Sequence, residues 1–186
     1  MAFVHHKLSL DDFLAWENTQ PDRNEFHRGE VFAMVGGRRT HERVIANLVR
    51  HIGNQLDGTP CQVFAAGLKL QIADDTVLYP DLMVTCSKSD LAADLALRAP
   101  TLVIEVLSPS TQAYDRSQKF ALYRRLVSLQ EYILVDPETR RVEGFQRGAD
   151  DRWVLCDMSQ DAVLQASSVG CSVAMEQVFQ GMDPAD

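Results

Sequence analysis

Two acidic residues stand in apolar segments where a charged side chain is unexpected. Glu105 lies within Leu102–Leu107, whose other five residues are all apolar, and Asp81 follows Tyr79-Pro80. An isolated buried carboxylate is costly, so Glu105 must be paired, protonated or bound to a metal, unless it faces solvent on an edge strand. Two carboxylates that converge from neighbouring strands would form a hard oxygen site suited to Mg²⁺ or Mn²⁺.

A lysine follows these strands on a predicted helix over Asp115–Leu126. Asp115, Lys119 and Tyr123 are spaced i, i+4, i+8, so they share one helix face. If that face packs toward Glu105, the ammonium could orient or deprotonate water, or offset charge on a phosphoryl oxygen. Spacing alone favours a simpler interpretation, a surface ion pair between Asp115 and Lys119 worth about 0.3–0.5 kcal/mol.

Hydrophobic periodicity and turn residues predict the elements that hold these residues. Ser9 is a plausible cap for a helix over Leu8–Asn18, and Thr40 for an amphipathic helix over His41–Leu56. Glu25–Val35 predicts a hairpin. Further strands are expected over Gln62–Ile72, Val77–Thr85, Thr101–Leu107, Tyr132–Val135, Val142–Gln146 and Trp153–Leu155, before an irregular acidic end with a short helix at Ala174–Phe179. The order predicts one α/β or α+β domain over residues 1–186.

Composition limits the class of protein. The chain has 186 residues, 46% apolar and 24% charged, which is typical of a globular domain with a real core. No apolar run approaches the ~18 residues needed to span a bilayer. Met1–Leu10 lacks the apolar stretch of a signal peptide, so we expect a cytoplasmic protein without a membrane partner.

Charge is unevenly distributed along the chain. The formal net charge is -8, so non-specific coating of nucleic acid is not expected, yet two stretches are locally basic, 23–51 and 110–147. Their arginines could face phosphates, or they could simply be solvated helix faces. Candidates for backbone phosphates are Arg38, Arg39, Arg116 and Arg124.

The four cysteines show no metal-binding spacing. None forms a Cys-x-x-Cys pair, and no histidine stands at finger-like spacing to them, which argues against zinc. Cys61 and Cys86 lie in or beside apolar, strand-like segments. We expect both to be buried, reduced thiols.

Several motifs together resemble one known family. They are Glu25-Phe26-His27-Arg28-Gly29-Glu30, Tyr79-Pro80-Asp81-Leu82-Met83-Val84, the segment from Ala99 to Thr111, Asp115-x-x-x-Lys119-x-x-x-Tyr123, and Glu131 to Pro137. This pattern resembles the Uma-two family of restriction-endonuclease-like proteins, within the PD-(D/E)XK nuclease superfamily. The resemblance extends from about Leu8 to Phe179, and its most specific part is Leu102–Thr111 with Lys119 behind it.

The resemblance implies a restriction-endonuclease-like core, a mixed central sheet flanked by helices, and Mg²⁺- or Mn²⁺-dependent hydrolysis of phosphodiester bonds. Asp81 and Glu105 would bind the ion with help from the backbone carbonyl of Val106. The superfamily places a lysine two residues after the second acid, where this chain has Leu107. The resemblance suggests that Lys119 takes that role from the following helix.

The resemblance also adds two candidate catalytic residues and the partners. Glu25 on the early hairpin could enter the site, and His41 could contact a phosphate or water at a helix N-terminus, although it could equally be an ordinary helix residue. Glu30 and Glu42 are interpreted as surface charges. DNA and a second copy of the chain are the expected partners. Two alternatives stay open: a nucleic-acid-binding or assembly module that does not cut, and a metal-dependent hydrolase with another substrate.

Overall fold

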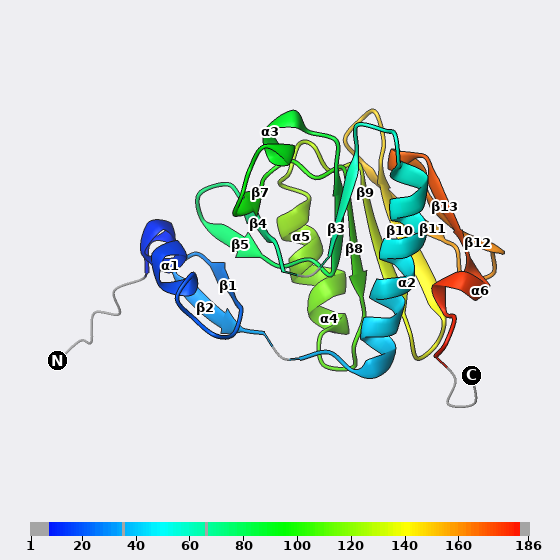
Figure 1. Ribbon diagram of the computed structural model, residues 1–186, viewed down its shortest axis with the longest axis horizontal. Coiled ribbons are helices and arrows are strands. Elements are labelled where there is room, and N and C mark those ends of the chain that lie inside the picture. The colour runs from blue at the N-terminus through cyan, green and yellow to red at the C-terminus, as the bar shows by residue number, and fades with distance from the viewer. Residues whose placement is uncertain (1–7, 35, 66, 183–186) are drawn as a thin grey trace.

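The computed structural model describes residues 8–34, 36–65 and 67–182, and its centre is a six-stranded mixed sheet (Figure 1). In spatial order its strands are β11 (Trp153–Asp157), β10 (Arg141–Arg147), β9 (Glu131–Asp136), β8 (Leu102–Val106), β6 (Leu82–Thr85) and β3 (Gln62–Ala65). β8 and β9 are parallel, and the other neighbours in this sheet are antiparallel. β8 therefore lies inside the sheet and is not an edge strand.

Alternating side chains of the central strands form two separate apolar cores. Leu102, Ile104 and Val106 pack on one face of the sheet with the amphipathic helix α2 (Arg39–Leu56). Val103 and Leu107 pack on the other face, against the helical segment 112–123. That segment consists of α4 (Gln112–Tyr114), a π-helical turn (Asp115–Lys119) and α5 (Phe120–Tyr123). Because side chains alternate along a strand, Glu105 shares the second face.

A second, five-stranded sheet extends the molecule on its N-terminal side (Figure 1). Its spatial order is β2 (Glu30–Ala33), β1 (Asn24–His27), β5 (Thr76–Leu78), β4 (Lys69–Ile72) and β7 (Ala96–Leu97). The β1–β2 turn has positive φ at Arg28 and Gly29, as a two-residue hairpin turn requires. Helix α1 (Leu10–Glu17) is attached through buried Glu17, which accepts hydrogen bonds from Tyr79 (2.5 Å) and Lys69 (2.8 Å).

The chain ends in a small hairpin and a short helix at the opposite end of the molecule (Figure 1). β12 (Val163–Ala166) pairs with β13 (Cys171–Ala174), and α6 (Met175–Val178) follows as expected. The sequence analysis treated this region as irregular, apart from the short helix, and missed the hairpin. Its alternating burial supplies Leu164 and Val173 to the core that contains α2.

Two of the expected strands are wrong as single elements, because each divides between the two sheets. Gln62–Ile72 separates into β3 and β4 around Gly67, whose φ of +145° favours glycine. Val77–Thr85 separates into β5 and β6 on either side of Pro80, which cannot donate a ladder hydrogen bond. Asp81 therefore stands where the chain passes from the outer sheet into the central sheet.

The helix starts agree only in part with the sequence patterns. Ser9 caps α1 as expected, since its Oγ accepts a hydrogen bond from the backbone N–H of Asp12. Thr40 is not the cap of α2, because that helix begins at Arg39 and no side chain caps it. A short helix, α3 (Lys88–Leu91), joins β6 to β7. No helix in the described ranges is both long and apolar enough to cross a bilayer.

The expectation of two buried, reduced thiols at Cys61 and Cys86 is wrong. The two residues are half-buried and form a disulfide with a Cα–Cα distance of 4.0 Å. Gln62 pairs with Thr85 in the antiparallel β3–β6 register, so the two cysteines are the next pair outward. The register of two strands, which the sequence alone does not show, brings the sulfurs together.

Reduction of this disulfide is expected to destabilise the fold. The bridge spans 25 residues, for which lost loop-closure entropy corresponds to about 3 kcal/mol of unfolding free energy. Urea unfolding of the wild type with dithiothreitol should match the Cys61→Ser/Cys86→Ser double variant without it, whereas Cys156→Ser should behave like the oxidised wild type. If dithiothreitol leaves the unfolding midpoint unchanged, the two thiols are free and the disulfide is absent. Free thiols are the usual state of cysteines in a reducing compartment.

Candidate active site

Asp81 and Glu105 face each other across β6 and β8. Leu82 pairs with Ile104 in this antiparallel register, so the next pair outward is Asp81 and Glu105. Directly opposed residues of antiparallel strands project from the same face of the sheet. The backbone N–H of Val106 donates to Asp81 Oδ2 at 2.8 Å, and the N–H of Asp81 lies 3.4 Å from Glu105 Oε2. The two acids that the sequence separates are neighbours in space.

The environments of the two carboxyls shift their pKa values in opposite directions. Glu105 is only 2% exposed, and burial raises its pKa well above the ordinary value, with a further contribution from the charge of Asp81. Burial also acts to raise the pKa of Asp81, but the hydrogen bond and charge of His41, together with Lys119, lower it overall. A pair of acids in one site with divergent pKa values is typical of functional carboxylates.

Lys119 supplies the positive charge beneath this pair. Its Nζ lies 3.0 Å from Glu105 Oε1, 3.4 Å from Glu25 Oε1 and 3.7 Å from Asp115 Oδ1. Burial alone would lower the pKa of Lys119, but these carboxylates raise it well above the ordinary value. The ammonium is thus charged and enclosed, and the interpretation of Asp115–Lys119 as a surface ion pair is wrong.

The helical segment 112–123 positions the lysine by turning one face toward β8 and β9. Asp115, Lys119 and Tyr123 are all buried on that face, as their i, i+4, i+8 spacing predicts. Tyr123 donates its hydroxyl to Glu105 Oε1 at 2.6 Å, and Tyr132 of β9 donates to the backbone carbonyl of Asp115 at 3.0 Å. The π-helical turn at 115–119 lies at the site, where such turns are frequent.

Glu25 enters the site from the outer sheet. It lies on β1 and is 7% exposed. Its Oε1 accepts the backbone N–H of Tyr79 at 3.1 Å and approaches Lys119. The hairpin therefore contributes a third carboxylate beside the lysine. A catalytic role of Glu25 stays a prediction.

His41 lies in the first turn of α2 and contacts the other side of Asp81. Its Nε2 is 3.3 Å from Asp81 Oδ2, and its Nδ1 is 3.3 Å from Glu42 Oε1. Burial alone would lower the pKa of His41, but the hydrogen bond and charge of Asp81, with Glu42, raise it overall. Glu42 is otherwise exposed, as expected of a surface charge.

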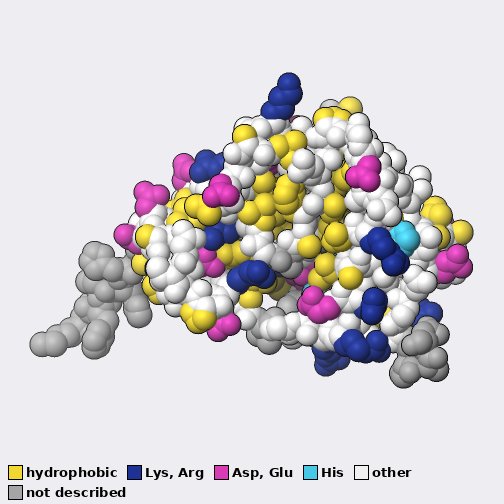
Figure 2. Space-filling model, viewed as in Figure 1, with side chains coloured by type: hydrophobic (Ala, Val, Ile, Leu, Met, Phe, Trp, Pro, Cys, Tyr) yellow, Lys and Arg dark blue, Asp and Glu magenta, His cyan; other side chains and the backbone are white. Residues whose placement is uncertain are grey.

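Most of the arginines proposed for phosphates are engaged within the chain. Arg38 pairs with Glu138 at 2.9 Å, and Arg116 pairs with Glu143. Arg39 donates to the backbone carbonyls of residues 181 and 182. Basic side chains gather along the exposed side of α2 (Figure 2), where Arg43 and Arg50 are exposed. Arg124 differs from the first three because its guanidinium has neither an ion pair nor a hydrogen bond in the part of the chain described here, and contacts only the ring of Phe120.

Two groups of the site were not among the predicted catalytic residues. Tyr123 and Asp115 both contact the cluster formed by Lys119 and the carboxylates. Their i, i+4, i+8 spacing with Lys119 is the sequence signal by which they could have been found. A contribution from the Val106 carbonyl stays a prediction, whereas the structure assigns its N–H to Asp81.

The donor set fits a hydrated magnesium ion better than a zinc ion. Among residues 8–34, 36–65 and 67–182, no group of three or more His, Cys, Asp or Glu side chains is arranged to hold a metal. Mg²⁺ keeps several waters and commonly binds through only one or two carboxylates. Asp81 and Glu105 are two neighbouring carboxylates of this kind, and Glu105 Oε2 faces the backbone N–H of Asp81.

The chain is similar to several known proteins. A family model described as "Uma2: Putative restriction endonuclease" matches residues 10–176. Two uncharacterized proteins of Synechocystis sp. are 34% and 32% identical, over 95% and 86% of this chain and 93% of each relative. The crystal structure of "a putative nuclease belonging to DUF820" from Anabaena variabilis has a TM-score of 0.74 at 20% identity, covering 92% of this chain and 97% of that one. The latter likeness confirms the expected α/β fold.

Replacing Lys119 with methionine is expected to destabilise the metal-free protein by about 3–5 kcal/mol, because buried carboxylates lose their cation. Without it the pKa values of Glu105 and Asp115, which burial already raises in the wild type, would rise further above their unfolded-state values, so the loss should be larger at pH 7 than at pH 4.5. Urea unfolding at both pH values measures this. Lys88→Met, on exposed α3, is the matched control and should change stability little. Equal effects of the two variants would contradict the role given to Lys119.

Proposed function

The chain belongs to the Uma2 family, whose description is "Putative restriction endonuclease", and from this premise we propose that it is an Mg²⁺-dependent endonuclease that hydrolyses phosphodiester bonds of DNA. The observation that carries the proposal is the opposed pair Asp81 and Glu105 with Lys119 bound to Glu105. Mn²⁺ would serve the same hard oxygen ligands. A binding module needs no such costly arrangement of buried charges.

The residues have distinct roles in this proposal. Asp81 and Glu105 would hold the ion, together with the Val106 carbonyl. A bound Mg²⁺ supplies positive charge that polarises the phosphodiester and makes water more acidic. Lys119 holds Glu105 in place and contributes positive charge where the phosphoryl group gains negative charge. Leu107 is buried in the apolar core on this face, so the helix is the available source of a lysine.

His41 and Glu25 complete the proposed site from opposite sides. His41 contacts Asp81 from the N-terminal turn of α2, where it can donate to a phosphate oxygen or exchange a proton with water. Glu25 binds Lys119 and the Tyr79 amide, which fixes the ammonium between β1 and β8. In this proposal Glu25 acts by positioning Lys119.

A specific observation also favours the non-cleaving alternative. Lys119 is surrounded by Glu25, Glu105 and Asp115, so its charge is already compensated within the fold. A module that keeps the nuclease fold for binding or assembly would need no divalent ion. Calorimetric titration with Mg²⁺ separates these two functions, because only the nuclease needs to bind the ion. The third possibility is a metal-dependent hydrolase of another substrate. Assays on a panel of phosphodiesters, with and without competing DNA, test it.

Cleavage of both strands would be served by two copies of the chain related by two-fold symmetry. A homodimer is therefore part of the proposal. Light scattering coupled to size-exclusion chromatography, with and without duplex DNA, measures the number of copies.

Asp81→Asn and Glu105→Gln are expected to reduce Mg²⁺-dependent cleavage of plasmid DNA at least about 100-fold, because each removes half of the carboxylate pair. Glu42→Gln, which neutralises an exposed acid near the site, should cleave nearly as the wild type does. Rates of nicking and linearisation on agarose gels, with and without EDTA, measure the effect. Wild-type rates in Asp81→Asn would refute the assignment.

Magnesium affinity is expected to rise with pH. The raised pKa of Glu105 means that the metal-free site retains a proton at pH values where an ordinary glutamate is ionised, and the ion must displace it. Calorimetric titrations in buffers of different ionisation enthalpy would therefore show proton release, which Glu105→Gln should abolish. If Mg²⁺ binds without proton release and with an affinity that does not change with pH, the proton and the metal do not compete for Glu105.

A further inference from the structure

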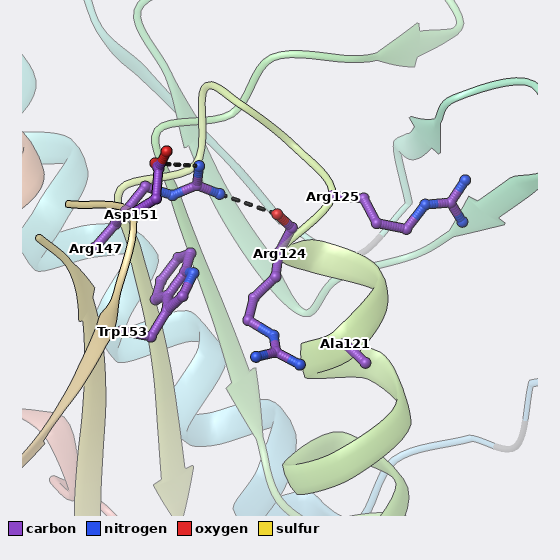
Figure 3. Close-up of a pocket in the computed structure, with 6 residues that line it drawn as sticks. All are labelled: Ala121, Arg124, Arg125, Arg147, Asp151 and Trp153. Carbon is purple, nitrogen blue, oxygen red and sulfur yellow. Dashed lines mark hydrogen bonds and ion pairs between the residues drawn. The ribbon is translucent and has the colours of Figure 1, made fainter. Parts of the chain in front are cut away.

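A groove lies outside the carboxylate site, between the end of α5 and the turn that joins β10 to β11. Its volume is about 420 Å³. Six residues line it, with three arginines and one tryptophan among them (Figure 3): Ala121, Arg124, Arg125, Arg147, Asp151 and Trp153. Guanidinium groups beside an aromatic ring are typical of surfaces that bind phosphate and sugar.

Arg147 is held rigidly in the wall of this groove. Its Nη2 donates to the backbone carbonyls of Arg124 (3.0 Å) and Leu126 (2.8 Å), and its guanidinium stacks 5.0 Å from the ring centroid of Trp153. Its side chain is 11% exposed, and its one ion pair within the described residues, at 3.3 Å, is with Asp151, whose side chain is 85% exposed. Its Nε is buried without a hydrogen-bond partner within the described chain. The groove therefore presents a fixed guanidinium with a weakly held counter-ion.

Arg124 supplies a second guanidinium, and this one is free to move. It is exposed, and its contact is a cation–π interaction 4.9 Å from the ring centroid of Phe120. Figure 3 shows it on the same side of α5 as Trp153, whereas Arg125 turns away. Arg125 pairs instead with Asp75 at 2.7 Å. Arg124 and Arg147 are thus the two groups available to an anion in the groove.

The surrounding surface is favourable to an anion in a protein of net charge -8. Among the charged side chains of residues 112–125, Asp115 and Lys119 are buried at the carboxylate site, which leaves Arg116, Arg124 and Arg125 on the outer side. The outer side of this helix therefore carries no acidic residue of its own. The carboxylates that pair with arginines around it, Glu143, Asp75 and Asp151, come from other elements and leave Arg124 unpaired among the described residues.

We propose that this groove binds a backbone phosphate of the nucleic acid strand, on Arg124 and Arg147, with the adjoining sugar against Trp153. This inference rests on the proposed function, because the bound strand is the substrate. From Lys119 to Arg124 the helical segment rises about 7.5 Å at 1.5 Å per residue. That rise corresponds to about two nucleotides at 3.4 Å per nucleotide. The groove thus extends the footprint of the enzyme beyond the bond that is cleaved.

The two tryptophans of the chain provide a direct test. Trp16→Phe leaves Trp153 as the single tryptophan, so its fluorescence reports on the groove. The titration uses a 20-base-pair duplex, with EDTA present to prevent cleavage. The emission of Trp153 should change as duplex is added and reach a plateau when the binding site is saturated. Arg124→Gln in this background should weaken binding about tenfold, and it should reduce the slope of log K against log salt by about 0.9, for one lost phosphate contact.

Arg152→Gln is the matched control, because it also removes one positive charge, from the turn between β10 and β11 at the other wall of the groove. Its side chain is 85% exposed, pairs with Asp150 and does not line the groove. It should leave affinity and salt slope unchanged, whereas Arg124→Lys should retain most of the affinity. Thermal unfolding checks that Arg124→Gln is folded. Equal binding by Arg124→Gln and Arg152→Gln would overturn the proposal.

Further outcomes separate this proposal from the nuclease itself. Binding that depends on Arg124, without any cleavage that depends on Asp81, would support the groove and refute the endonuclease. Cleavage that depends on Asp81, with binding that Arg124→Gln does not affect, would support the endonuclease and refute the groove. Inorganic phosphate at low millimolar concentration should not reproduce the change in Trp153 emission. If it does, the groove binds free phosphate and its assignment to a nucleic acid strand is overturned.

Discussion

The ammonium of Lys119 is the charge on which the arrangement of this site depends. Opposed like charges on neighbouring strands repel, and burial makes each isolated carboxylate costly. Lys119 lies within 4 Å of Glu25, Glu105 and Asp115 and offsets both effects at once. Three buried acids nevertheless exceed one cation. Burial raises the pKa of Glu105, and the charges of Asp81 and Asp115 raise it further, so a divalent cation would relieve this excess of negative charge.

Lys119 also explains why so much of the chain must fold before a site exists. The second acid comes from β8, the first from the entry into β6, and the third from β1 of the outer sheet. The helix that bears the lysine is fixed to β8 through Tyr123 and to β9 through Tyr132. Two sheets and the helix between them therefore converge on one small volume, and no single element holds the chemistry by itself.

In these proposals, hydrolysis takes place on one side of the helical segment 112–123 and binding of the strand takes place on the other. The inward face carries Asp115, Lys119 and Tyr123, where charges are enclosed and positions are determined by packing. Arg124 follows directly and is solvent-exposed, where a guanidinium can adjust to a flexible strand. Charges enclosed away from water suit hydrolysis, because exclusion of water strengthens their interaction with the reacting groups. Exposed charges suit binding of a nucleic acid strand, which is driven by release of the counter-ions bound to its phosphates.

The sequence by itself predicted candidate site residues and most elements, because local signals carry these predictions. Glu105 in an apolar strand, the i, i+4, i+8 spacing around Lys119 and the Ser9 cap all act over a few residues. Tertiary structure decided the features that depend on register and on which sheet a strand joins. It divided the segments around Gly67 and Pro80, paired Cys61 with Cys86, and placed Asp81 opposite Glu105. Strand pairing joins residues distant in the chain, and periodicity within one segment carries no information about its partner.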